Sequence, residues 1–182
     1  MTIKNETISI LETRRSCRNF KPDMITDEEL ETVIRAGTFA PSGKNQQSSV
    51  IIAVTNKELR DQIMEENRKI GGWQEGFDPF YGAPVILIVI TDKDANNASG
   101  TYINDGSLVM GNLMNAAASI DLGSVWIHRA RQEFESDFGK AILAKLGIQG
   151  NYEGIGHVAL GYPAKELPKP AARKENYVYY VR

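Results

Sequence analysis

Arginine side chains are concentrated in one short segment near the start of the sequence. Arg14, Arg15 and Arg18 lie within five residues of one another, and Ser16 adds a hydroxyl group between them. A guanidinium group can hold a phosphate through two parallel hydrogen bonds, so this cluster suits phosphate recognition. A solvated surface patch is the alternative for a basic run considered by itself.

Two later segments favour a ligand site over a surface patch. Residues 40–47 read Ala-Pro-Ser-Gly-Lys-Asn-Gln-Gln, and their backbone amides, Asn and Gln side chains can pair with the polar edge of a heteroaromatic ring. Residues 160–163 read Leu-Gly-Tyr-Pro and are followed by a proline-containing arm. That arm carries a second basic pair, Arg173 and Lys174.

Several better-known nucleotide and metal motifs are incomplete. Ser42-Gly43-Lys44 is not the phosphate-binding loop of nucleoside triphosphatases, because Asn45 stands where a Ser or Thr would hold magnesium. Gly154-Ile155-Gly156 lacks the third glycine of a dinucleotide fingerprint. His128 and His157 have no partner at metal-ligand spacing, so we expect no metal site.

Composition limits the class of protein. The length of 182 residues fits one domain, and 42% hydrophobic with 24% charged residues is typical of a soluble globular protein. The net charge of −2 gives no global field for nucleic acid, and no apolar stretch is long enough to cross a membrane. The single cysteine, Cys17, excludes a disulfide scaffold and favours the cytoplasm. Its place between Arg15 and Arg18 could activate a thiol, but a spacer in a basic loop is the favoured interpretation.

Helices and strands must position these polar segments. The continuous apolar run at 85–91 indicates a strand covered on both faces, and the nearly all-apolar residues 105–121 indicate an enclosed helix. Thr26 and Glu29 have the spacing of a capping box, and Gly37 is interpreted as the end of that helix. The pattern predicts helices at 3–13, 26–37, 56–69, 105–121 and 132–146, strands at 50–55, 85–91, 124–128 and 154–162, and a strand-like tail at 177–181. This order predicts an α+β protein with three layers, in which helices cover a mixed sheet.

Together, the three polar segments resemble the nitroreductase family of FMN-dependent oxidoreductases. Its Arg-Arg-Ser-x-Arg-x-Phe motif is matched by residues 14–20, its Ala-Pro-Ser-x-x-Asn-x-Gln motif by residues 40–47, and its Gly-Tyr-Pro motif with a later arginine by residues 161–173. The resemblance extends over nearly the whole chain. It implies a three-layer α-β-α sandwich with a long central apolar helix. Residues 1–182 would form a single FMN-binding domain with a C-terminal arm from about residue 163.

By this resemblance, FMN is held by groups from two subunits of a homodimer with shared sites. Arg14, Ser16 and Arg173 would hold the phosphate, and Arg18 would lie toward the ribityl chain and the pyrimidine edge. Residues 41–47 would reach the flavin from the other subunit, and the backbone of residues 124–129 would face the N5 region of the ring. The implied cofactor-binding residues are Arg14, Arg15, Ser16, Arg18, Pro41, Ser42, Gly43, Asn45, Gln47, Trp126, Ile127, His128, Arg129 and Arg173.

The implied activity is two-electron transfer from NAD(P)H, through FMN, to a small aromatic acceptor such as a nitroaromatic or a quinone. No separate catalytic side chain is implied, because the flavin carries the chemistry. Two alternatives stay open: a non-catalytic flavin-binding or storage protein, and a relative that uses FMN for other work such as dehalogenation or enoate reduction.

The sequence departs from the family pattern at two places. Ser48 and Ser49 stand where members commonly have Pro and Trp, so we expect different packing near the flavin. His128 and Arg129 are bulkier and more basic than the small residues often found there. That change suggests a preference for anionic or hydrogen-bonding acceptors.

Overall fold

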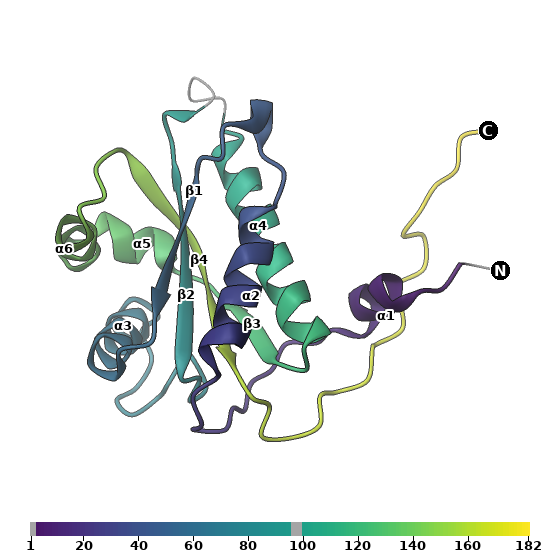
Figure 1. Cartoon of the computed structure of the whole chain (residues 1–182), viewed down its shortest axis with the longest axis horizontal. Helices are drawn as coiled ribbons and strands as arrows, with labels where there is room; N and C mark the ends of the chain where they lie inside the picture. Colours follow the sequence, from purple (N-terminus) through teal and green to yellow (C-terminus); the bar gives the residue numbers. More distant parts are fainter. Residues whose placement is uncertain (1–2, 96–99) are drawn as a thin grey trace.

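The computed structural model describes residues 3–95 and 100–182, and in that part of the chain a four-stranded sheet forms the centre (Figure 1). Its strands lie in the spatial order β1 (Ser49–Val54), β2 (Val85–Asp92), β4 (Tyr152–Gly161) and β3 (Gly123–Ile127). Each neighbouring pair is antiparallel. β4 follows the other three strands in sequence but lies between β2 and β3, so distant segments must meet to complete the sheet.

Helices cover both faces of the sheet (Figure 1). α2 (Asp27–Thr38) and α4 (Tyr102–Ser119) lie on one face, and α3 (Lys57–Ile70), α5 (Ala130–Glu135) and α6 (Asp137–Leu146) lie on the other. α1 (Glu6–Thr13) lies beside the C-terminal half of α4. The expected α+β class and its three layers are therefore confirmed. Among the described residues, no helix is both long and apolar enough to span a membrane.

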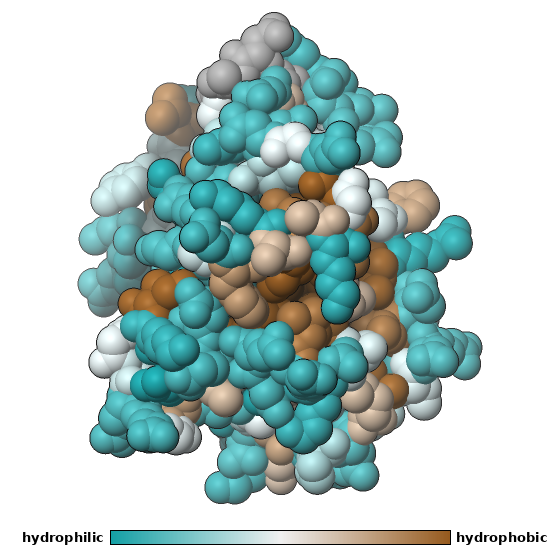
Figure 2. All heavy atoms as spheres, turned by 90° about the vertical axis from the view of Figure 1, so that its left-hand side faces the viewer, coloured by the Kyte–Doolittle hydropathy of each residue, from teal (hydrophilic) through white to brown (hydrophobic). Residues whose placement is uncertain are grey.

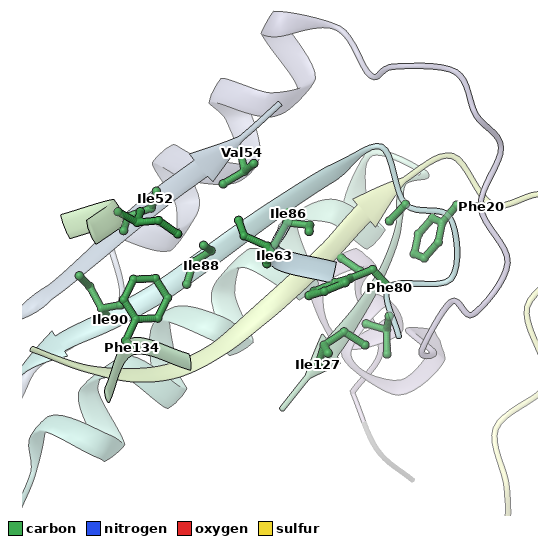
Figure 3. Close-up of a cluster of buried hydrophobic side chains, with 14 of the residues drawn as sticks. Phe20, Ile52, Val54, Ile63, Phe80, Ile86, Ile88, Ile90, Ile127 and Phe134 are labelled. Atoms are coloured by element: carbon green, nitrogen blue, oxygen red, sulfur yellow. The ribbon is translucent and has the colours of Figure 1, made fainter. Parts of the chain in front are cut away.

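Alternation along β2 divides the core into two halves. Ile86, Ile88 and Ile90 face α3 and α5 (Figure 3), whereas the intervening residues face α2 and α4. All six residues from Val85 to Ile90 are 0% exposed, which explains why this strand is apolar without alternation. From the side of α3 and α6, hydrophobic side chains are visible in the middle of the face and hydrophilic ones surround them (Figure 2).

The strand directions differ from those of the mixed sheet that the sequence predicted. The three strand pairs are antiparallel, and within the described residues parallel pairing occurs only in an isolated bridge between Ser16 and Ser124. Helices on both faces bury an antiparallel strand as fully as a parallel one. The apolar run therefore predicts burial but does not predict direction.

Contacts between elements explain one predicted helix end and correct another predicted helix. Gly37 is the penultimate residue of α2, within one residue of the expected end, and a Cβ there would stand 2.6 Å from Leu113 Cδ2 on α4. Glycine therefore allows α2 and α4 to approach closely. The helix expected at 132–146 is interrupted at Ser136, whose extended backbone ends α5 and whose hydroxyl oxygen accepts a hydrogen bond from the Gly139 amide to begin α6.

A C-terminal arm leaves the body of the molecule after Pro163 (Figure 1). Residues 169–182 are exposed, and Tyr179 is 82% exposed. Each hydrogen bond and ring contact of residues 169–182 joins two residues of the arm. The strand-like tail expected at 177–181 forms no strand, because it meets no sheet edge within one chain.

Candidate functional site

The arginine-rich segment is held against the start of β3. A parallel bridge joins Ser16 to Ser124, and the Cys17 amide donates a hydrogen bond to the Ser124 carbonyl oxygen at 3.0 Å. Cys17 is 1% exposed and packs against Gly123, and burial raises the pKa of its thiol. The cysteine is therefore a packing residue, and the backbone on either side of it is fixed.

The Gly-Tyr-Pro segment anchors the other end of the same stretch. The Lys21 amide donates to the Tyr162 carbonyl oxygen at 2.9 Å, and the Ala164 amide donates to the Asn19 carbonyl oxygen at 2.9 Å. The Tyr162 hydroxyl donates to Glu29 Oε2 at 2.7 Å. This motif therefore links the arginine-rich segment, the beginning of the arm and the first turn of α2.

Tyr162→Phe tests that link. The tyrosine hydroxyl is the largest cause of the lowered pKa of the Glu29 carboxyl, followed by the Thr26 amide. We expect the variant to lose about 0.5–1 kcal/mol of unfolding free energy at pH 7, because one hydrogen bond to a solvent-accessible carboxylate is removed. A lowered carboxyl pKa stabilises the fold above the ordinary value of 4.5, and this contribution is lost as the pH falls through the lowered value.

The measurement is urea unfolding of the two proteins at pH 7 and at about pH 3, below the ordinary range of glutamate. The difference between them should shrink at the lower pH. Tyr179→Phe, in the exposed arm, is the control and should match the unaltered protein at both pH values. A difference that grows on acidification would contradict the assigned bond.

Arg14 lines a cavity of about 290 Å³ beside the anchored segment. Its half-buried guanidinium forms no ion pair or hydrogen bond with the residues that the structure describes, and burial first, then the neighbouring Arg15, lower its pKa. Ser124 lines the same cavity, and its hydroxyl oxygen is buried without a hydrogen-bond partner. The other charged residues that line this cavity are Arg15, Lys165, Asp121 and Glu166. An uncompensated cation beside an unsatisfied hydroxyl fits a phosphate group.

The other two arginines of the segment have different surroundings. The Arg15 guanidinium donates to the carbonyl oxygens of Glu12 and Arg14, and so it caps the C-terminal end of α1. Arg18 is exposed. Arg14 is therefore the member of the cluster whose guanidinium is both half-buried and available to a ligand.

The loop after α2 has an unusual backbone. Gly43–Asn45 form a short 3-10 turn, and Lys44, Asn45 and Gln47 have positive φ angles of 51°, 55° and 49°. The left-handed region is uncommon for residues other than glycine. Three such residues in four positions indicate that other contacts hold this loop in place.

This loop lies at the opposite end of α4 from the arginine cavity. Pro41, Ser42 and Gln47 line a cavity of about 270 Å³ together with Asp105, in the first turn of α4. Ala118, in the last turn, lines the arginine cavity. At 1.5 Å per residue the two ends are about 20 Å apart along the helix. One chain therefore does not bring the loop and Arg14 together.

The structure shows how the two serines that depart from the family pattern are used. The Ser48 hydroxyl donates to Asp105 Oδ2 at 3.1 Å, and the Ser49 and Thr91 hydroxyl oxygens are 3.1 Å apart. Hydrogen bonds to α4 and β2 thus secure this part of the chain. Asp105 was not recognised as a site residue from the sequence. The available signal was a carboxylate at the beginning of an apolar helix, because such a group is rarely buried without a partner.

The third predicted group lies at the end of β3. Ile127 is buried and Trp126 is half-buried in the core, whereas His128 is exposed. Arg129 has a φ of 83°, and its guanidinium carbon lies 4.2 Å from the centre of the Trp73 ring. Trp73 belongs to the loop at 71–84 that precedes β2, so this loop lies beside the end of β3.

Arg173, the last predicted site residue, lies in the exposed arm. Its guanidinium donates to the Ala171 carbonyl oxygen, and it does not line the cavity that contains Arg14. The predicted residues thus form separate groups within one chain: Arg14 to Ser16 with Ser124, the 41–47 loop, the end of β3, and the arm.

These features define a three-layer α+β protein with a cavity lined by Arg14 at one end of its central helix and a polar loop at the other. Two solved structures have the same fold along their whole length. A nitroreductase with bound FMN from Desulfitobacterium hafniense has a TM-score of 0.87 and 27% identity, covering 99% of this chain and 100% of that one. A nitroreductase with bound FMN from Bacteroides fragilis has a TM-score of 0.85 and 27% identity, covering 98% of this chain and 100% of that one.

The sequence pattern that defines the nitroreductase family matches residues 11–162 of this chain, and the chain belongs to this family. A protein of Archaeoglobus fulgidus, provisionally named NADH dehydrogenase/NAD(P)H nitroreductase, is 30% identical over 161 residues, which cover 88% of this chain and 87% of the relative. An FMN reductase (NAD(P)H) of Bacillus subtilis is 29% identical over 190 residues, with 94% and 72% coverage. The expected family is therefore confirmed.

Proposed function

We propose that this chain is an FMN-dependent NAD(P)H oxidoreductase that reduces nitroaromatics, quinones or similar small aromatic acceptors by two-electron transfer. The observation that carries the proposal is the half-buried Arg14, which has no ion-pair partner among the described residues and lies beside the unsatisfied Ser124 hydroxyl. Relatives with the same fold contain FMN, whose phosphate would satisfy both groups. The single cysteine supports a cytoplasmic location.

Arg14 and Ser124 line the cavity that would hold the phosphate of the cofactor, whereas the roles of Ser16 and Arg173 are proposed from the family resemblance. Arg14 and Ser16 hold the phosphate, with Ser124 as an additional donor and Arg173 as a second cation from the arm. The backbone of residues 126–129 lies toward the ring, and the neighbouring Trp73 helps to exclude water from it. When bound, FMN supplies the electron-transfer chemistry, and the chain supplies binding and orientation.

The proposal includes a homodimer, because the polar loop and Arg14 lie at opposite ends of α4. If two copies of α4 pack antiparallel about a two-fold axis, the loop of one subunit lies beside the arginine cavity of the other. Groups about 20 Å apart in one chain would then meet at each of two shared sites. Ile103 and Leu108 of α4 are 44% and 46% exposed, and such a contact would cover them.

The test of this function begins with the protein as purified. We expect a yellow protein that releases FMN, and no FAD, on denaturation, because a cluster of arginines suits a terminal phosphate and no dinucleotide fingerprint is present. Chromatography of the released flavin identifies it. Addition of NADH or NADPH should then bleach the bound flavin, and a quinone or nitroaromatic should restore its colour. A flavin that neither nicotinamide bleaches would favour the storage protein, and a preparation that binds no flavin on titration would overturn the proposal.

A further inference from the structure

Asp105 is a buried carboxylate whose partners lie outside its own helix. It is 4% exposed in the first turn of α4, where the helix dipole favours a negative charge. Oδ1 accepts a hydrogen bond from the Gly43 amide at 2.9 Å, and Oδ2 accepts one from the Ser48 hydroxyl at 3.1 Å. The side chain therefore binds the polar loop and is not used as a cap for α4.

The two groups that Asp105 binds enclose the strained part of the loop. Lys44, Asn45 and Gln47, all with positive φ, lie between Gly43 and Ser48. A left-handed conformation is unfavourable for a residue other than glycine and persists only where neighbouring contacts impose it. Within the loop, the Gln47 amide donates to the Ser42 hydroxyl oxygen at 2.9 Å. Asp105 fixes both ends of this stretch to a rigid helix.

We propose that Asp105 is a positioning residue that holds residues 43–48 in the shape required to contact FMN across the dimer. This inference rests on the proposed function of the loop. Because Asp105 belongs to α4, the loop shape is set by the helix that the proposed dimer places at its centre. A carboxylate suits this role because it accepts hydrogen bonds at two oxygens, so one side chain binds both ends of the loop.

Two substitutions of Asp105 test whether its two hydrogen bonds hold the loop in place. Asp105→Ala removes both acceptors, and we expect a tenfold to hundredfold higher Kd for FMN, with the loop released. Asp105→Asn keeps one acceptor for the Gly43 amide, and its new amide can donate to the Ser48 oxygen, because a hydroxyl group both donates and accepts. This conservative variant should bind FMN within about threefold of the unaltered protein.

The rate of tryptic cleavage after Lys44 in the flavin-free protein measures the mobility of the loop backbone. Lys44 is exposed, so its rate of cleavage depends on the mobility of the backbone around it. We expect faster cleavage in Asp105→Ala and an unchanged rate in Asp105→Asn. Ser48→Ala removes the donor to Oδ2 while Asp105 keeps its bond to the Gly43 amide, so this variant should also accelerate cleavage and weaken FMN binding, by less than Asp105→Ala does.

The outcomes distinguish the inference from the proposed function. If Asp105→Ala keeps both the FMN affinity and the cleavage rate of the unaltered protein, Asp105 does not position the loop. If cleavage accelerates but neither Asp105→Ala nor Asn45→Ala changes FMN affinity, the loop does not contact FMN, and that part of the proposed function fails instead. Should Asp105→Ala not fold, Ser48→Ala decides, and an FMN affinity and cleavage rate equal to those of the unaltered protein would overturn the inference.

Discussion

Arg14→Ala should weaken FMN binding about tenfold to a hundredfold, since loss of a charged hydrogen-bond partner costs about 1.5–3 kcal/mol. The same change should leave the flavin-free protein as stable as before or slightly more stable. Its guanidinium is half-buried without an ion-pair partner among the described residues, so its removal relieves a desolvated charge. A residue that lowers stability in the absence of ligand but is needed for the ligand has the signature of a binding group.

Titration of the flavin-free protein with FMN, followed by flavin fluorescence, measures the affinity, and thermal unfolding measures the stability. Lys44→Ala is the matched control, because Lys44 is an exposed cation in the polar loop and contributes about 0–1 kcal/mol. Equal losses of affinity in the two variants would show that the phosphate is bound elsewhere. A large loss of stability in Arg14→Ala would show a structural role.

Removal of residues 169–182 should lower the affinity for FMN by a similar factor, because it removes a different contact to the cofactor. This truncation leaves Leu167, which packs against the core, and removes the part of the arm whose contacts are all internal. A single chain should therefore fold as before. We expect FMN affinity to fall at least tenfold, because Arg173 is lost. We also expect part of the dimer to dissociate, because the aromatic tail at 177–180, which is exposed in the single chain, is no longer available to pack on the second subunit.

Light scattering with and without FMN gives the mass, which should be twice 20.2 kDa for the full-length protein and should fall toward the mass of one shortened chain on truncation. Arg173→Ala in the full-length chain separates the two causes, since it should weaken FMN binding without changing the mass. A truncated protein that stays dimeric and keeps its FMN affinity would show that the arm contributes to neither.

The elements with strong local signals were predicted correctly. Thr26 and Glu29 form the expected capping box, and the apolar run of β2 is buried throughout, whereas α4, which was expected to be enclosed, is buried on one side and leaves Leu108 46% exposed in the single chain. These signals act over a few residues, and burial of apolar surface enforces them whatever the rest of the chain does. The family resemblance rested on motifs of the same local kind.

Contacts between distant residues were not predicted. A glycine in a helical pattern can mark the end of the helix or a close approach to another helix. The sequence around Gly37 does not show that it also packs closely against Leu113. His157 and Glu133 face each other at 3.2 Å in the interior, both 0% exposed, but they lie on different elements and share no sequence spacing. Asp105 and Ser48 form their bond across 57 residues of sequence. The site groups were found from residue types, whereas their separation along α4 required the fold.

The position of β4 in the sheet has a consequence for synthesis of the chain. β2 ends at Asp92 and its central neighbour begins at Tyr152, so the ribosome adds about 60 residues, over about 3–12 s at about 5–20 residues per second, before β2 can pair on that edge. During this time a wholly apolar strand keeps an open edge, which is a template for association with other nascent chains. Slower initiation or a lower growth temperature should therefore raise the soluble yield more than added flavin does, because FMN has no site until β4 is in place.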